Sequence, residues 1–177
     1  MKTAARSLAF ALLFTSFLHA QKHELAFTGG GDFVSTFHTT GALEACYARR
    51  LIHVPMVGLY GELPLGIGLQ NGTSLGTARY SSVFFTPGLK VKFTPPLGVA
   101  PYFLVGGGVA HFNGSGGAAS STSGAVDFGG GVDLNLAPLL GVRAEVRDYY
   151  SGTAKLVTSA SGRQHNVFVT AGIVLRF

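Results

Sequence analysis

The sequence predicts an all-β protein, an eight-stranded antiparallel up-and-down transmembrane β-barrel with a polar lumen filled by side chains. Three observations predict this fold. Charged residues make up 12% of the 177-residue chain and hydrophobic residues 47%, whereas soluble domains carry roughly 25% charged residues. After residue 20, no segment approaches the roughly 20 consecutive apolar residues of a membrane-spanning helix. Apolar and polar side chains alternate along most of the predicted strands.

Residues 1–20 have the pattern of a cleavable secretory signal peptide. Lys2 and Arg6 precede the apolar and hydroxyl run Ser7–Leu18, and the small residue Ala20 precedes a polar glutamine. As a helix, this run would span only about 18 Å of a hydrocarbon core about 30 Å thick. It is too short for a membrane anchor, so we expect export and cleavage.

Residues 21–177 are expected to form a single barrel domain, because no sharp change in composition marks a second one. Loss of the signal peptide would lower the formal charge from +5 to +3, which is too modest to indicate nucleic-acid binding. Cys46 is the only cysteine, so no internal disulfide can form. We expect it to be a small buried side chain, with intermolecular pairing as the alternative.

Short turns and longer polar loops alternate along this domain, as they do in transmembrane barrels. Prolines mark the short turns, at Pro55, at 95–96 and at Pro138. The longer breaks are rich in Gly, Ser, Thr and Asn, and they cover residues 35–40, 70–77, 113–124 and 151–163. Eight strands are predicted between the breaks, at residues 23–34, 41–51, 54–69, 78–94, 99–112, 125–136, 139–150 and 164–177. An even number of strands would bring both ends of the domain to the periplasmic side.

The first four predicted strands have ionisable residues on one face. In the first strand Leu25, Phe27 and Phe33 alternate with polar residues, and neighbouring side chains in a strand point to opposite faces. The polar face of these four strands carries Glu24, Thr28, Asp32, Glu44, Glu62, Lys90 and Lys92. The fifth strand is nearly all apolar, so its inner face is ambiguous.

The last three predicted strands alternate almost strictly. Their polar face carries Asp127, Asp133, Arg143, Glu145, Arg147, Tyr149 and Arg176. From residue 167 onward the final strand is apolar at every odd position, namely Val167, Val169, Ala171, Ile173, Leu175 and Phe177. A turn centred on Pro138 would place Asp133 opposite Arg143 as a cross-strand pair.

Seven of the eight acidic residues thus fall on one face, together with Arg50 and the strand lysines and arginines. In a soluble eight-stranded barrel the interior is apolar and the exterior polar. The opposite pattern here predicts a lipid-facing exterior and an ion-paired lumen, because a buried charge without a partner costs several kcal/mol.

Glycine runs at residues 29–31, 106–108 and 129–131 fall inside predicted strands. We interpret them as points of close backbone approach and sharp curvature. None has the spacing of a phosphate-binding loop, so nucleotide binding is rejected. Some tyrosines near strand ends are expected to form interfacial aromatic girdles, the candidates being Tyr47, Tyr60, Tyr80, Tyr102, Tyr149 and Tyr150.

The segment Val167–Phe177, with its odd apolar positions and final phenylalanine, resembles the C-terminal signature of bacterial outer-membrane proteins. Residues 21–177 resemble the small eight-stranded outer-membrane β-barrel family that includes the outer-membrane protein A transmembrane domain and opacity-like proteins. The resemblance implies a location in the bacterial outer membrane, contact with its lipid and lipopolysaccharide, and recognition of the strand ending at Phe177 by the barrel assembly machinery. It says little about activity, because such relatives act as adhesins, membrane anchors or lipid-modifying enzymes.

A lipid hydrolase would need a nucleophile and a base near the outer leaflet, and the available residues are His111, Asp148, Ser151 and His165. Enzymes of this family that remove acyl chains from lipid A carry a His and a Ser close together on one strand face. His165 has no serine two positions later, so the match fails at its most diagnostic residue.

Two further constellations are weighed. Arg143, Glu145 and Arg147 recur every second residue and are interpreted as part of the ion-paired lumen rather than as a tuned catalytic carboxylate. The histidines do not fall at a compact metal-ligand spacing, so we expect neither a metal nor a cofactor; they are His23, His38, His53, His111 and His165.

The predicted function is a non-enzymatic integral outer-membrane protein with a structural or surface-interaction role. The alternatives are an outer-membrane enzyme acting on envelope lipid and a small passive, porin-like pore. The loops carry only Lys155 and Arg163 as charges, so surface interaction is not supported by specific residues.

Overall fold

The computed structural model describes residues 22–34, 39–72, 79–95, 98–115, 119–152 and 162–177. The predicted signal peptide, residues 1–20, lies outside these ranges, as do His38 and Lys155. Within the described ranges, no helix has the length and apolar character needed to span a bilayer.

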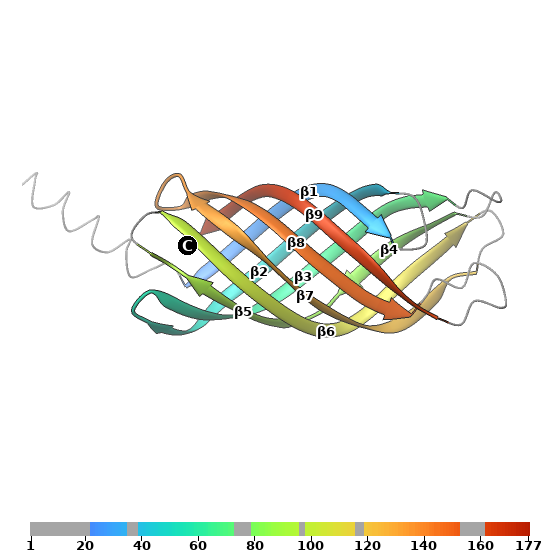
Figure 1. The fold of residues 1–177 in the computed structure, drawn as a ribbon, viewed down its shortest axis with the longest axis horizontal. Coiled ribbons are helices and arrows are strands. Elements are labelled where there is room, and N and C mark those ends of the chain that lie inside the picture. The colour runs from blue at the N-terminus through green and yellow to red at the C-terminus, as the bar shows by residue number, and fades with distance from the viewer. Residues whose placement is uncertain (1–21, 35–38, 73–78, 96–97, 116–118, 153–161) are drawn as a thin grey trace, which may run out of the picture.

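The described chain forms one closed antiparallel barrel (Figure 1). Its strand segments are β1 (His23–Val34), β2 (Thr40–Val54), β3 (Val57–Gly72), β4 (Arg79–Phe85), β5 (Gly88–Phe93), β6 (Val99–Ser115), β7 (Ser121–Asn135), β8 (Leu140–Gly152) and β9 (Arg163–Arg176). Both β4 and β5 pair with β3 on one side and with β6 on the other. They therefore occupy one position in the barrel, and the predicted eight-stranded fold is confirmed.

The break between β4 and β5 corrects the predicted continuous strand at residues 78–94. It falls at Thr86 and Pro87, where proline has no N–H to donate to the ladder. The Pro87 carbonyl still accepts a hydrogen bond of 3.1 Å from the Gly107 amide of β6. The strand is thus interrupted without opening the barrel wall.

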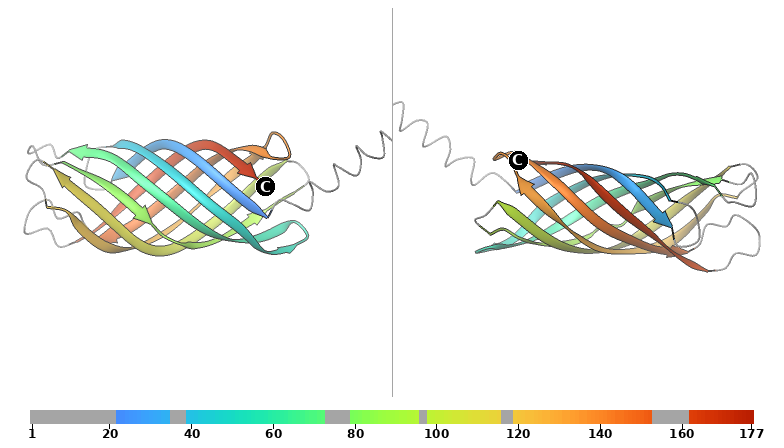
Figure 2. Two further views of the ribbon diagram at one scale, coloured as in Figure 1. Left: turned by 180° about the vertical axis from the view of Figure 1, so that it is seen from behind. Right: turned by 45° about the horizontal axis from the view of Figure 1, so that its top comes forward.

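The barrel closes where β1 pairs with β9, along the register from Glu24 opposite Arg176 to Val34 opposite Asn166. At one end the His23 amide donates to the Phe177 carbonyl (2.9 Å), and the Phe177 amide donates to the His23 carbonyl (3.0 Å). We call this the terminal end. The turns at Pro55 and Pro138 also lie there, as do Thr94 and Gly98 on either side of the third predicted turn, and the opposite end is called the loop end (Figures 1 and 2).

The glycine runs allow close approach between neighbouring strands. A Cβ atom at Gly30 would overlap the Val169 carbonyl oxygen, and one at Gly129 would overlap the Val146 carbonyl oxygen. Only glycine fits these positions without a shift of the backbone, which confirms the interpretation of close backbone approach.

Several strands extend farther toward the loop end than predicted. The predicted loop at residues 113–124 is wrong in extent, because His111 pairs with Thr122 and Phe112 pairs with Ser121. Serine and threonine fit within a strand ladder as well as in a loop, so composition alone misplaced this boundary.

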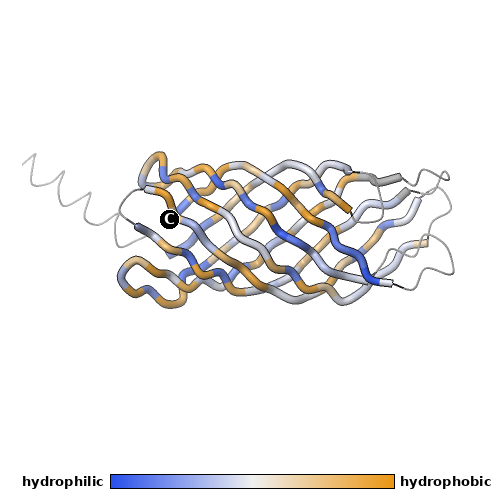
Figure 3. The backbone as a smooth tube through the Cα atoms, viewed as in Figure 1, coloured by the Kyte–Doolittle hydropathy of each residue, from blue (hydrophilic) through white to orange (hydrophobic). Residues whose placement is uncertain are grey.

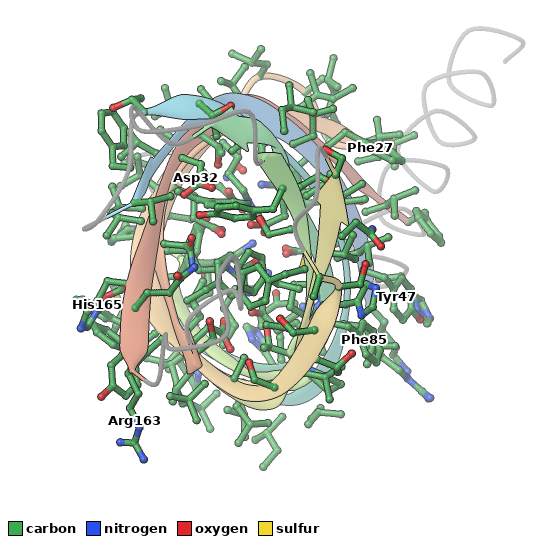
Figure 4. All side chains as sticks on the ribbon, turned by 90° about the vertical axis from the view of Figure 1, so that its right-hand side faces the viewer. Phe27, Asp32, Tyr47, Phe85, Arg163 and His165 are labelled. Carbon is green, nitrogen blue, oxygen red and sulfur yellow. The ribbon has the colours of Figure 1, made fainter. Side chains whose placement is uncertain are left out.

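The inside-out distribution of side chains is confirmed. On the outer surface Phe103 is 68% exposed and Phe128 is 52% exposed, whereas Lys90 and Arg147 in the lumen are 0% exposed. Hydropathy changes repeatedly along the strands in Figure 3, and Figure 4 shows Phe27 and Phe85 outside the ring of strands with Asp32 inside it. Such an exterior suits lipid rather than water.

Candidate functional site

The lumen near the terminal end is filled by a network that we call the basic layer. Its two carboxylates are Glu24 and Asp133, and its cations are Lys90, Lys92, Arg143 and Arg176. Arg143 Nε donates to Asp133 Oδ1 over 2.8 Å, so the predicted cross-strand pair is confirmed. Lys92 donates to both Glu24 and Asp133. The two carboxylates are each shared by at least three cations.

The middle of the lumen has the opposite balance, and we call it the acidic layer. A single guanidinium, that of Arg147, lies among four carboxylates, at 3.4 Å from Glu44, 3.0 Å from Glu62, 2.9 Å from Asp127 and 2.8 Å from Glu145. Three neutral groups also donate to these carboxylates: the hydroxyls of Tyr102 and Tyr149, and the Cys46 thiol.

These contacts confirm that Arg143, Glu145 and Arg147 belong to an ion-paired lumen. Glu145 is 3% exposed, and its oxygens accept from Arg147 (2.8 Å) and from Tyr102 (2.5 Å). Cys46 is buried, as predicted. A carboxylate held in this way is positioned for structure, because no substrate can reach it without displacing the network.

Toward the loop end the lumen is filled by rings that we call the aromatic layer: Tyr80, Phe84, Phe112, Tyr149 and Phe168. The Phe84 and Tyr149 rings stack with centroids 4.4 Å apart, and Phe168 packs edge-on against Tyr149 at 5.0 Å. Phe84 also meets Phe112 and Phe168 edge-on. The lumen is therefore filled, as predicted, but in this half largely by aromatic rings, and the inward side chains of Gln164 and Asn166 are buried there as well.

Sequence reasoning missed most of the aromatic layer. The available signal was the inward register, because Phe168 lies on the same face of its strand as Asn166 and Thr170. The layer also explains the ambiguous fifth strand, whose buried side chains include Tyr102, Leu104 and Phe112. Four tyrosines proposed for girdles are buried in the lumen instead, namely Tyr60, Tyr80, Tyr102 and Tyr149.

The residues weighed for hydrolysis do not converge. His165 and Asp148 are paired on the outer face, with Nδ1 of His165 2.7 Å from Oδ2 of Asp148. Ser151 lies on the opposite face of its strand, is 2% exposed, and donates to the Gly152 carbonyl. Arg163 and His165 both point away from the barrel in Figure 4. The wall of the barrel thus separates this serine from the imidazole.

His111 has partners that the sequence did not reveal. Its Nδ1 lies 2.7 Å from the Thr122 hydroxyl, and its Nε2 lies 3.0 Å from Oδ1 of Asn113. The pairing of His111 with Thr122 was hidden because Thr122 had been placed in a loop. The group that would orient this imidazole is thus a neutral amide and not the carboxylate of a catalytic triad.

No group of three or more His, Cys, Asp or Glu side chains suited to a metal occurs in the part of the chain that the structure describes. Near the terminal end His23 is hydrogen-bonded to Tyr47 (2.7 Å) and stacks on Phe177. The absence of a metal or cofactor remains a prediction.

Neither the family models nor the curated proteins compared with the chain give a match. Solved structures do. Neisserial surface protein A has a TM-score of 0.60 at 13% identity, covering 88% of this chain and 96% of that one. The outer membrane enzyme PagL has a TM-score of 0.59 at 17% identity, covering 87% and 98%. Ail, the attachment invasion locus protein of Yersinia pestis, in complex with a heparin analogue, has a TM-score of 0.57 at 16% identity, covering 88% and 99%.

At these identities the likeness concerns the fold and not the activity. The proteins matched include an enzyme and an attachment protein on the same architecture, and a fold does not by itself imply a function. The closed barrel, its apolar exterior and these matches together lead to one conclusion: the chain has the fold of the small eight-stranded β-barrels of the bacterial outer membrane.

Proposed function

We propose that the chain is a non-enzymatic integral protein of the bacterial outer membrane, with a structural or surface-interaction role in the envelope. Residues 1–20 would act as a cleavable signal peptide and residues 21–177 as the membrane domain. Outer-membrane lipid and lipopolysaccharide would surround the apolar face, and the barrel assembly machinery would recognise the strand that ends at Phe177.

The observation that carries this proposal is a barrel with an apolar outer face and a filled lumen. The exposed side chains of its outer face include phenylalanines, leucines and valines on every long strand, for example Phe27, Leu43, Leu63, Val105, Phe128, Val146 and Ile173. A surface of this kind exceeds the few hundred Å² of contiguous apolar area found on soluble monomers. Lipid is the solvent that matches it.

The filled lumen supports a role without conduction. The basic, acidic and aromatic layers follow one another along the axis, and each contains large side chains that are less than 2% exposed, for example Arg143, Arg147 and Phe84. Small barrels leave little interior space once side chains occupy it. The proposal therefore disfavours a passive pore.

The positions of Ser151 and His165 support a role without catalysis, because the serine hydroxyl lies inside the barrel wall and the imidazole lies outside it. The His111–Thr122 pair is the observation that keeps an envelope-lipid enzyme as the second candidate. It has a hydroxyl beside an imidazole on the outer face, but the orienting partner recorded is an amide.

Membrane fractionation of a Gram-negative host that expresses the full chain tests the location. We expect recovery in the outer-membrane fraction, faster gel migration of unheated than of heated samples, and a mature N-terminus at Gln21. A product that is soluble in the periplasm would overturn the proposal.

Two assays on the same cells separate the rival functions. Mass spectrometry of lipid A should give the same profile with and without expression, and a profile changed by the wild type but not by His111→Ala would establish the enzyme. Planar-bilayer recordings should show no reproducible conductance, and stable channels would establish the pore.

A further inference from the structure

A cavity of about 420 Å³ opens at the terminal end of the barrel, below the basic layer. The turn between β7 and β8 forms part of its wall, and Tyr60 and Asn135 line its sides. Three cationic side chains also line it, namely Arg50, Lys92 and Arg176, together with the one carboxylate of Glu24. Its volume falls within the roughly 300–1,000 Å³ of small-ligand sites.

The charges behind this cavity are unevenly divided along the barrel axis. In the basic layer, four cations share two carboxylates, whereas in the acidic layer four carboxylates share Arg147. Among the ion pairs of the described residues, two longer ones connect the layers: Lys90 to Glu62 at 3.7 Å and Arg143 to Glu145 at 4.0 Å. The end of the lumen that faces the cavity therefore carries excess positive charge.

Arg50 adds a fifth cation to this end. It lies at a β-bulge, where the register between β2 and β3 shifts between Arg50 and Ile52. Ordinary strand alternation up to this point places successive side chains on different sides: Arg50 lines the cavity and donates to the Tyr60 hydroxyl, whereas its neighbour Arg49 is exposed on the outside. A guanidinium has five N–H donors, so this single contact leaves donors for a ligand.

Arg176 and Lys92 complete the rim and floor. The Arg176 side chain is 9% exposed and is the least buried member of the basic layer. Its Nη2 atom lies 3.1 Å from Oδ2 of Asp133. Lys92 is almost fully buried between Glu24 and Asp133. The floor is thus rigidly ion-paired while the rim is accessible, which is the arrangement of a preformed site.

We infer that this cavity binds a small anionic ligand through a carboxylate or phosphate group, held chiefly by Arg50 and Arg176. The carboxylate of Glu24 lines the cavity too, but Arg50, Lys92 and Arg176 outnumber it, so the charge that an incoming anion meets is positive on balance. The inference rests on the proposed function in one respect, namely that the terminal end, and with it the cavity, faces the periplasm. The binding chemistry stands on the cavity itself.

Calorimetric titration of the chain, extracted from membranes in detergent, tests the inference at low ionic strength. Inorganic phosphate is one probe and sodium acetate the other, each against a chloride solution of equal ionic strength. Saturable binding of phosphate alone would assign a phosphate ligand, and saturable binding of acetate alone would assign a carboxylate. Heat that does not saturate with either probe would overturn the inference.

Arg50→Gln and Arg49→Gln form a matched pair, because they remove the same charge from adjacent residues on opposite sides of the wall. We expect Arg50→Gln to weaken binding about tenfold or more and Arg49→Gln to change it less than about twofold. Equal weakening by both would mean that the anion senses only the overall charge, and would overturn the site.

Asn135→Asp is a second variant, and it leaves every ion pair of the basic layer in place. Asn135 is exposed at the end of β7 and lines the cavity, so a carboxylate there should abolish binding. Heat-modifiable migration checks that each variant is folded. A folded Asn135→Asp that binds as tightly as the wild type would contradict the proposed position of the anion.

Discussion

The two halves of the lumen are filled by different chemistry within one continuous barrel. Toward the terminal end the inward positions hold ion pairs, for example Arg143 with Asp133 at 2.8 Å. Toward the loop end they hold rings, for example Phe84 stacked on Tyr149 at 4.4 Å. Both halves satisfy the requirement that a small barrel be filled, since a void would lose contacts on all sides.

The difference shows that the loss of one side chain lowers the stability of the barrel for different reasons in the two halves. A ring in the aromatic layer contributes by its own burial, so its loss leaves a cavity. A charge in the ionic half contributes through its partners, so its loss leaves other charges buried and uncompensated. Within the ionic half the acidic layer is the more vulnerable, because its four carboxylates share Arg147, and Glu44 and Asp127 have no other ion pair among the described residues.

Arg147→Met should have the largest effect. Four buried carboxylates would lose their shared cation, and the free energy of unfolding in lipid vesicles should fall by about 4–5 kcal/mol, or the barrel should fail to assemble. Urea titration followed by heat-modifiable migration measures this. Arg163→Met, at the exposed rim, is the control, and it should leave the unfolding transition nearly unchanged. If the two variants unfold alike, the acidic layer does not depend on Arg147.

Phe84→Ala should be nearly as damaging, at about 3–4 kcal/mol, because the 0% exposed ring touches Tyr149, Phe112 and Phe168. The neighbouring Phe85 faces outward and is 43% exposed, so Phe85→Ala is a matched control. We expect Phe85→Ala to cost less than half as much in the same urea titration. A reversed order would place the stabilising rings on the outside.

Arg176→Met should cost less than Arg147→Met, about 1.5–3 kcal/mol, although both remove a guanidinium from the lumen. Glu24 and Asp133 would keep Lys92 and Arg143 as partners, so no carboxylate is left alone. Parallel urea titrations of the two variants give the comparison. A cost equal to that of Arg147→Met would argue against the unequal division of charge.

Cys46→Ser should have the smallest effect, below about 1 kcal/mol, because the thiol makes two long contacts of 3.8 Å, with Glu62 and with the Tyr47 carbonyl. The native thiol is 2% exposed, so a maleimide should label it only after unfolding. The time course of labelling, measured by mass spectrometry, checks both points. Rapid labelling of the folded barrel would show that the acidic layer admits solutes.

The alternation of side chains predicted the architecture because lipid tolerates few charges. In the final strand every odd position from residue 167 onward is apolar, and the structure turns these residues outward. The Asp133–Arg143 pair was predictable as well, because a short turn fixes the register of a hairpin. Local pattern and turn geometry were sufficient for both.

Contacts across the lumen were not predictable in the same way. The four partners of Arg147 come from β2, β3, β7 and β8, and the aromatic layer draws on rings from β4, β6, β8 and β9. Alternation assigns a side chain to the lumen but not to a height or a partner within it. The interruption at Pro87 was different, because its signal was present and the apolar pattern on both sides concealed it.

The pairing of β1 with β9 has a consequence for how fast the protein acquires its structure. Each other junction of the barrel joins segments that are near neighbours in sequence, whereas this one brings together residues such as Glu24 and Arg176 from opposite ends of the domain. Closing so long a loop costs chain entropy, and this cost arises before the contacts between β1 and β9 can offset it. Formation of this junction is therefore expected to be the slow, late step of folding. Substitutions confined to β1 and β9 should change the rate of barrel closure more than they change the rate at which the hairpins form.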